Sequence, residues 1–304
     1  VDNLIGGYRD NVPDKCDFIV ADVCNLEVMT EIASGCDVAY HCAALAYEGL
    51  SVFSPLAITD NIVCGSTSVM VAAIRNGLTR VVNCSSMARY GNNPTPYGEG
   101  LVPRPVDPYG VAKVAAENQM ALLGKVHGVS VVHAVPHNII GPRQRYDDPY
   151  RNVASIMVNR MLQGKQPIIY GNGNQRRCFS FVQDVLTVLI KLLDCDAKNG
   201  EAVNLGPDES PVTINELAAT IARLLDFKLQ PEYHTARPCE IEEALCSSDK
   251  IKQQFGYETT TSLENGLRSI VGYVSGRGPL PFCYDLPLEI HNNLLPKVWR
   301  DRLM

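Results

Sequence analysis

Residues 81–113 read VVNCSSMARYGNNPTPYGEGLVPRPVDPYGVAK, and this stretch decides the fold. It begins as an apolar strand ending in small hydroxyl residues, continues as a polar loop, and reaches Pro108, which opens a helix. Tyr109 and Lys113 are four residues apart, so on a helix they share one face. A strand-end Ser86 facing this pair predicts proton transfer, because the lysine cation lowers the pKa of the phenol and the serine hydroxyl hydrogen-bonds the reacting oxygen.

The tyrosine–lysine spacing is informative only in combination with the strand before it. Alone, Tyr-x-x-x-Lys occurs by chance on many solvated helix faces. Here residues 107–117 also match Asp-Pro-Tyr-Gly-x-Ala-Lys-x-x-x-Glu in full. The chain therefore resembles the extended short-chain dehydrogenase/reductase superfamily, and within it the nucleotide-sugar epimerases of the UDP-galactose 4-epimerase type. The resemblance implies an α/β fold: a Rossmann-type, doubly wound parallel sheet with a smaller C-terminal substrate-binding lobe.

Composition excludes several classes of partner. The chain has 304 residues and a net charge of −6 without a basic run, which argues against nucleic acid or an anionic membrane as the main partner. We find no apolar stretch of about 18 residues, so we expect no membrane span. The 11 cysteines form no C-x-x-C pair, so we expect reduced thiols in a cytoplasmic protein and neither a disulfide scaffold nor a metal site.

The resemblance also divides the chain into domains. It implies an NAD-binding Rossmann domain over 1–144, to which 180–206 returns, and a substrate-binding lobe with a tail over 145–179 and 207–304. Asp2 follows a strand-like end and would accept hydrogen bonds from a ribose. Such an acid comes about 20 residues after a glycine-rich phosphate loop. We therefore expect that the sequence lacks the first strand, that loop and the first helix; the alternative is that Asp2 is an ordinary terminal residue.

The resemblance assigns residues to an NAD site at the carboxyl ends of the strands. A strand is expected over 18–23, and the next strand, 38–44, runs into small residues that allow close approach of a cofactor. His41 is expected to be structural, and Ala46 replaces the family's lysine contact to the nicotinamide ribose. The implied cofactor-binding residues are Asp2, Asn3, Asp22, Val23, Cys42, Ala43, Ala44, Asn61, Ser85, Tyr109, Lys113 and Pro136.

The two residues after the catalytic serine separate the possible reactions. Related dehydratases carry Asp-Glu there, and decarboxylating relatives carry a glutamate two residues after the hydroxyl. Met87 and Ala88 stand at these positions, and neither can transfer a proton. A site with Tyr109 as its one acid–base group suits oxidation and re-reduction at one carbon. That is 4-epimerisation or a simple dehydrogenation, and it does not suit elimination.

The resemblance places the substrate-binding residues in the second half of the chain. Arg177 would hold the diphosphate, because a guanidinium fork suits phosphate oxygens. Ala244 hints that a 2-acetamido sugar fits, and His137 is expected to be a structural residue of a turn. The implied substrate-binding residues are Ser86, Met87, Ala88, Asn138, Asn152, Val153, Arg177, Arg237 and Glu240.

The leading functional hypothesis is an NAD-dependent nucleotide-sugar 4-epimerase for UDP-glucose and UDP-galactose, and possibly for N-acetylated sugars, acting through a transient 4-keto sugar. Two alternatives stay open: a dehydrogenase or reductase with net NAD(P) turnover, and a non-catalytic binding relative. The resemblance also implies a homodimer formed by the long helices expected over 55–76 and 110–123. The tail 275–304, with Trp299, is expected to pack on the surface of the subunit or in a dimer contact.

Overall fold

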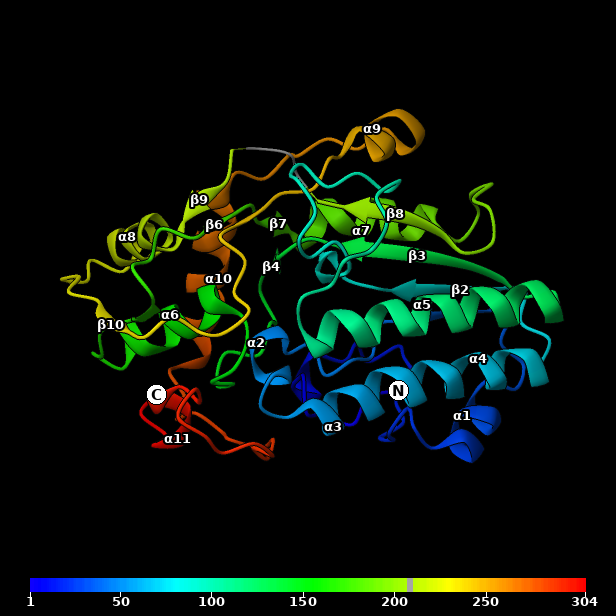
Figure 1. The fold of residues 1–304 in the computed structure, drawn as a ribbon, viewed down its shortest axis with the longest axis horizontal. Helices are drawn as coiled ribbons and strands as arrows, with labels where there is room; N and C mark the ends of the chain where they lie inside the picture. Colours follow the sequence, from blue (N-terminus) through cyan, green and yellow to red (C-terminus); the bar gives the residue numbers. More distant parts are fainter. Residues whose placement is uncertain (207–209) are drawn as a thin grey trace.

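The computed structural model describes residues 1–206 and 210–304, and a four-stranded parallel sheet lies at its centre (Figure 1). The strands lie side by side in the order β1 (Val38–His41), β2 (Arg80–Cys84), β3 (Ser130–Pro136) and β8 (Glu201–Leu205). Val81, Val82, Val131 and Val132 are completely buried, as expected for parallel strands covered on both faces. The predicted α/β fold with a parallel sheet is confirmed.

Helices cover both faces of this sheet. One face carries α1 (Leu26–Ile32), α5 (Pro108–His127) and a long run made of α3 (Pro55–Thr59), the π turn η2 (Asp60–Cys64) and α4 (Gly65–Arg75). The other face carries α7 (Val182–Lys191) and α9 (Asp249–Phe255), which both pack on β8 (Figure 1). β8 and α7 therefore add residues far along the chain to the first half of the molecule.

The long helical run from Pro55 to Arg75 is the one described helix that is long and apolar enough to cross a membrane. This differs from our expectation that no stretch would reach that length. The run packs between α1 and α5. Its apolar character is explained by this position, because a helix with neighbours on two sides buries more than one stripe of side chains.

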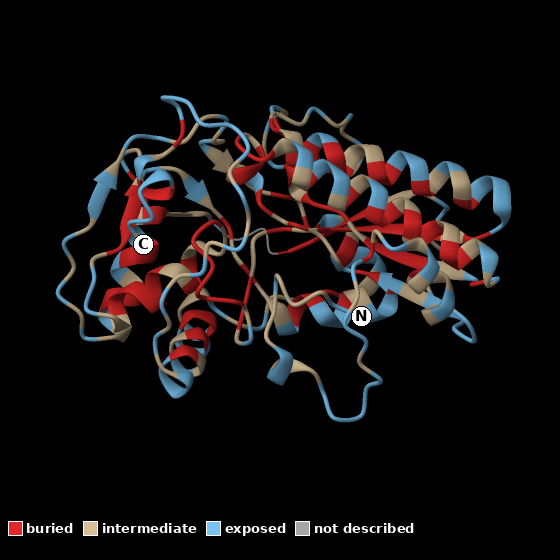
Figure 2. Cartoon of the chain, turned by 90° about the horizontal axis from the view of Figure 1, so that it is seen from below, coloured by how far each residue is buried: buried red, intermediate tan, exposed pale blue. Residues whose placement is uncertain are grey.

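A second lobe is built around three helices, α6 (Val153–Leu162), α8 (Ile214–Leu224) and α10 (Leu263–Arg277). Their facing apolar side chains form a separate core that appears red at the far end of the molecule in Figure 2. Thr213 and Glu216 form a capping box that starts α8. Short strands complete the lobe: β5 (Ile168–Tyr170) pairs with β10 (Glu232–His234), and β6 (Arg176–Arg177) pairs with β9 (Val212–Thr213) and β11 (Glu243–Ala244).

The strand expected over 18–23 does not form. Only Val20 pairs, in an isolated bridge with Asp2, and Ile19 and Val20 are exposed. A strand needs partners for its backbone groups along its whole length, and the described chain offers this segment only the residues around Asp2. The remaining short elements are η1 (Arg9–Asn11), α2 (Glu48–Ser51), η3 (Met87–Arg89), β4 (Ile139–Ile140), β7 (Ser180–Phe181) and α11 (Lys297–Arg300).

The C-terminal tail packs against its own chain. Trp299 in α11 is 1% exposed and makes edge-on ring contacts with Phe53, Tyr150 and Tyr170. These partners come from both halves of the molecule. The tail therefore packs in the hydrophobic cluster that contains residues of α2 and α3, and it connects this cluster to the second lobe. Of the two expected roles for this segment, intrachain packing is the one that the structure shows.

Candidate active site

Ser86, Tyr109 and Lys113 come together at the carboxyl end of β2. The Asp107 side chain accepts a hydrogen bond of 2.8 Å from the Gly110 amide and so caps α5, which places Tyr109 and Lys113 in its first two turns. Ser86 caps η3, and its hydroxyl also hydrogen-bonds with Tyr109. The sequence motif is therefore assembled as one polar cluster at the end of a buried strand.

The electrostatics of this cluster differ from the prediction in one respect. Burial raises the pKa of Tyr109, whose side chain is 7% exposed, and the hydrogen bond with Ser86 opposes this rise. Lys113 is not among the groups that act most strongly on Tyr109. Its Nζ donates a 2.8 Å hydrogen bond to the Cys84 carbonyl and lies 5.9 Å from the centre of the Tyr109 ring. This hydrogen bond holds the ammonium at the end of β2.

Most of the predicted cofactor residues line one cavity next to the end of β1. Asn61 fixes the loop after this strand, since its side chain accepts a 2.8 Å hydrogen bond from the Leu45 amide. The small side chains leave room for a planar group, and the Asp2 carboxylate is an acceptor for ribose hydroxyls. These residues fit the nucleoside parts of NAD. The predicted residues on the cavity wall are Asp2, Asn3, Val23, Cys42, Ala43, Ala44 and Asn61.

Tyr109, Lys113 and three other predicted cofactor residues are not on that wall. Asp22 adjoins it and accepts hydrogen bonds from the Asn3 side chain and the Cys24 amide. Pro136 ends β3, where it pairs with Leu205. Ser85 turns away from the site and donates to the buried carboxylate of Glu117 on α5. Only the backbone of Ser85 can therefore face a cofactor in this arrangement.

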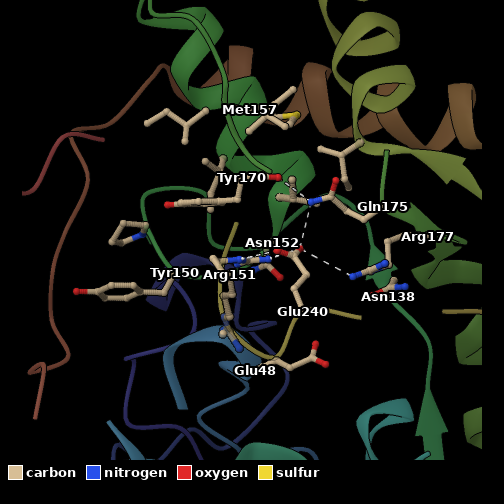
Figure 3. A pocket seen from close by; sticks show the side chains of 18 of the residues that line it. Glu48, Asn138, Tyr150, Arg151, Asn152, Met157, Tyr170, Gln175, Arg177 and Glu240 are labelled. Atoms are coloured by element: carbon tan, nitrogen blue, oxygen red, sulfur yellow. Dashed lines mark hydrogen bonds and ion pairs between the residues drawn. The ribbon is translucent and has the colours of Figure 1, made fainter. Parts of the chain in front are cut away.

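The predicted substrate residues of the second lobe line a larger cavity between the two halves (Figure 3). Its volume is about 270 Å³. Glu240 pairs with Arg237 at 2.8 Å and lies 3.9 Å from Arg177, which fixes both guanidinium groups on one wall. The predicted residues on its wall are Asn138, Asn152, Val153, Arg177, Arg237 and Glu240. The two arginines suit a diphosphate at this wall.

Met87 and Ala88 belong to the packing around the site. Ala88 is buried in the core cluster that contains Tyr109, and Met87 packs beside Tyr90 and Tyr97. Ala244 is buried in the same cluster as Tyr90 and Tyr97, so its small size is also part of a packed core. Its relation to an N-acetyl group stays a prediction.

Two histidines near the site are held neutral. Burial lowers the pKa of His41 to about 3, and its Nε2 pairs with the Ser66 hydroxyl at 2.9 Å. Burial likewise lowers the pKa of His137 to about 4, and its Nε2 lies 3.3 Å from the Ala244 carbonyl oxygen. Both positions are those of structural residues, in agreement with the reasoning from sequence.

Several residues of the site were missed from the sequence. Arg151 lines both cavities, so the cofactor cavity and the substrate cavity lie next to each other at this side chain. Trp299 and Glu48 line the larger cavity. Glu48 begins the four-residue helix α2, and Trp299 lies far away in the tail. Neither belongs to a motif with a recognisable spacing.

Comparison with known proteins supplies the family. The profile of the NAD-dependent epimerase/dehydratase family matches residues 1–206. The chain belongs to this family. It is similar to a putative UDP-glucose 4-epimerase of Methanocaldococcus jannaschii, with 29% identity covering 90% of this chain and 89% of the relative. It is also similar to a UDP-glucuronate 4-epimerase of Thermodesulfobacterium geofontis, with 24% identity covering 84% and 78%.

A solved epimerase agrees with the fold. The UDP-glucose 4-epimerase of Thermus thermophilus, crystallised with NAD, superposes with a TM-score of 0.82 at 26% identity, covering 90% of each chain. The predictions of an NAD-dependent enzyme, an extended short-chain dehydrogenase/reductase architecture and an epimerase relationship are therefore confirmed. The sugar on which this family member acts is a separate question, because the relatives differ in it.

Proposed function

We propose that this family member is a 4-epimerase of UDP-hexoses, with UDP-glucose and UDP-galactose as substrates. The observation that carries the proposal is the Ser86–Tyr109 pair, whose neighbours lie on the cofactor cavity and on a small pocket beside the arginines of the substrate side. Ala44 and Leu45, which pack with Tyr109, lie on the cofactor cavity, and Asp107 adjoins the arginines of the substrate side. Met87 and Ala88 supply no second acid for elimination or decarboxylation.

The proposed reaction uses one proton-transfer group. NAD, when bound, supplies a hydride acceptor that can return the hydride. Tyr109 accepts the proton of the sugar 4-hydroxyl, and Ser86 donates a hydrogen bond to the same oxygen. The resulting 4-keto sugar turns over in the cavity, and Tyr109 returns the proton when the other face is reduced. Lys113, at the end of β2, would hold the nicotinamide ribose.

Interconversion of nucleotide sugars tests the proposal. The protein is incubated with UDP-glucose, UDP-galactose and their N-acetyl forms, and the products are separated by chromatography. We expect interconversion without net absorbance from reduced nicotinamide. Net reduced nicotinamide would instead support the dehydrogenase alternative. A protein that holds NAD but converts none of these sugars would reject the proposal. Purification without NAD would favour the non-catalytic alternative.

We also propose that the enzyme is a cytoplasmic homodimer. Val111, Leu122 and Val126 on α5 are 54%, 64% and 72% exposed, which leaves an apolar strip on one of the two long helices. A second copy would cover it. Sedimentation should give a dimer for the native chain and a monomer for Leu122→Glu. Leu186→Glu on α7, also exposed, is the matched control and should stay dimeric.

A further inference from the structure

Glu48 is an acid in the substrate cavity that the proposed reaction does not use. It is the first residue of α2, which lies between the two halves of the molecule (Figure 1). Within residues 1–206 and 210–304, its carboxylate forms no hydrogen bond and no ion pair. In Figure 3 it lies on the side of the cavity where Arg177 lies, and no interaction joins it to the residues drawn. Glu48 is exposed, so its carboxylate is hydrated at the edge of the cavity and is available to a ligand.

The charge of Glu48 acts on both ends of the proposed substrate position. It raises the pKa of Tyr109, where the reacting carbon would lie. Arg177 and Arg237, where the diphosphate would lie, line one small pocket together with Glu48. Arg237 is held next to α2, since a Cβ on Gly49 would lie 3.2 Å from its Nη1. The part of a nucleotide sugar between the reacting carbon and the diphosphate is the hexose.

Glu240 differs from Glu48 in this respect. Its carboxylate is neutralised by Arg237 at 2.8 Å and receives a further hydrogen bond from Gln175. Glu48 therefore contributes a negative charge to the cavity wall, and no cation among the described residues forms an ion pair with it. A carboxylate accepts hydrogen bonds from sugar hydroxyls and repels a second carboxylate at close range.

We infer that Glu48 restricts the enzyme to nucleotide hexoses with an uncharged C6 group and discriminates against nucleotide uronates. This inference rests on the proposed 4-epimerase function. In that reaction the 4-keto ring presents both faces in turn, so the C3 side and the C5–C6 side of the ring exchange places. In one of the two orientations of the sugar ring, a carboxylate at C6 therefore lies close to Glu48 and is repelled by it.

Glu48→Gln tests the inference because it removes the charge and keeps the shape. We compare kcat/KM for UDP-glucose and UDP-glucuronate in the full chain with NAD. The native enzyme should prefer UDP-glucose by on the order of 100-fold, and the variant should reduce this preference at least about tenfold. The ratio isolates the sugar, because both substrates carry the same diphosphate and respond equally to any change at the arginines. Glu31→Gln on the exposed side of α1 is the control and should leave the ratio unchanged.

Equilibrium binding separates this inference from the proposed function. Calorimetry with UDP, UDP-glucose and UDP-glucuronate should show that Glu48→Gln gains more affinity for the uronate than for the other two. An unchanged ratio of uronate to glucose affinity, or native turnover of both sugars at equal rates, overturns the inference while epimerisation stands. If Glu48 controls the relative affinity for UDP-glucose and UDP-glucuronate but the protein interconverts no sugar, the epimerase function is rejected. The inference that Glu48 discriminates against a uronate by its charge would then stand.

Discussion

At the scale of single residues, the protonation of Tyr109 controls the proposed chemistry. Burial raises its pKa, so the phenolate that accepts a proton is gained as the pH rises. We therefore expect kcat/KM to increase with pH on the alkaline side of neutrality. Tyr109→Phe should lower kcat by about 10²–10⁴-fold, the range of a lost general base.

Tyr40→Phe is the matched control for this substitution. Tyr40 is an exposed tyrosine on β1 whose hydroxyl, among the described residues, hydrogen-bonds only to the backbone carbonyls of two α7 residues, at 3.2 and 3.4 Å. It should leave the rate and the pH profile unchanged. A Tyr109→Phe enzyme with native rates, and with an unchanged melting temperature to exclude misfolding, would remove Tyr109 from the mechanism.

At the scale of elements, the start of α5 is sensitive to pH because of its cap. Burial raises the pKa of Asp107 to about 7 from an ordinary value of 3.8, and one of its oxygens has no hydrogen-bond partner among the described residues. Because the folded state binds the Asp107 proton more tightly than the unfolded state, protonated Asp107 stabilises the fold. This stabilisation is complete below pH 3.8 and is lost as the pH rises through about 7. The free energy of unfolding should fall by up to ~4 kcal/mol over this window because of Asp107.

Asp107→Asn isolates this effect, because asparagine also caps helices and does not titrate. Its stability relative to the native chain should increase from pH 4 to pH 8 in urea unfolding curves. Asp107→Ala removes the cap as well and should cost about 1 kcal/mol relative to the asparagine variant at every pH. A constant difference between the native chain and Asp107→Asn across the pH range would contradict the assignment.

At the scale of the whole molecule, the tail connects the two halves through Trp299. Trp299→Ala should lower the free energy of unfolding by about 3–5 kcal/mol, because the fully buried ring contacts Phe53, Tyr150 and Tyr170. It should also weaken UDP-glucose binding, since Trp299 lines the larger cavity. Trp299→Phe should reduce the free energy of unfolding and the affinity for UDP-glucose by less than the alanine variant does. Urea unfolding and calorimetry measure these effects, and a loss under about 1 kcal/mol for the alanine variant would contradict them.

The features predicted correctly from sequence depend on local patterns. The parallel strands around residues 38–41 and 81–84, and the helix that carries Tyr109 and Lys113, follow from apolar runs, capping residues and turns. The motif itself placed Ser86 beside Tyr109, because the segment 87–107 that joins the strand end to the helix start folds back. Arg177, which the resemblance implies, lines the larger cavity, and its contact with a diphosphate stays a prediction.

Other features were decided only by tertiary structure. No local pattern shows that Ser85 turns toward Glu117, that Lys113 points to the Cys84 carbonyl, or that residues 18–23 lack strand partners. Glu48 enters the substrate cavity because the second lobe packs over α2, and Trp299 enters the core from the end of the chain. Helices and strands follow from hydrogen bonds and side-chain periodicity near in sequence. The orientation and charge environment of a side chain depend on residues that only folding brings next to it.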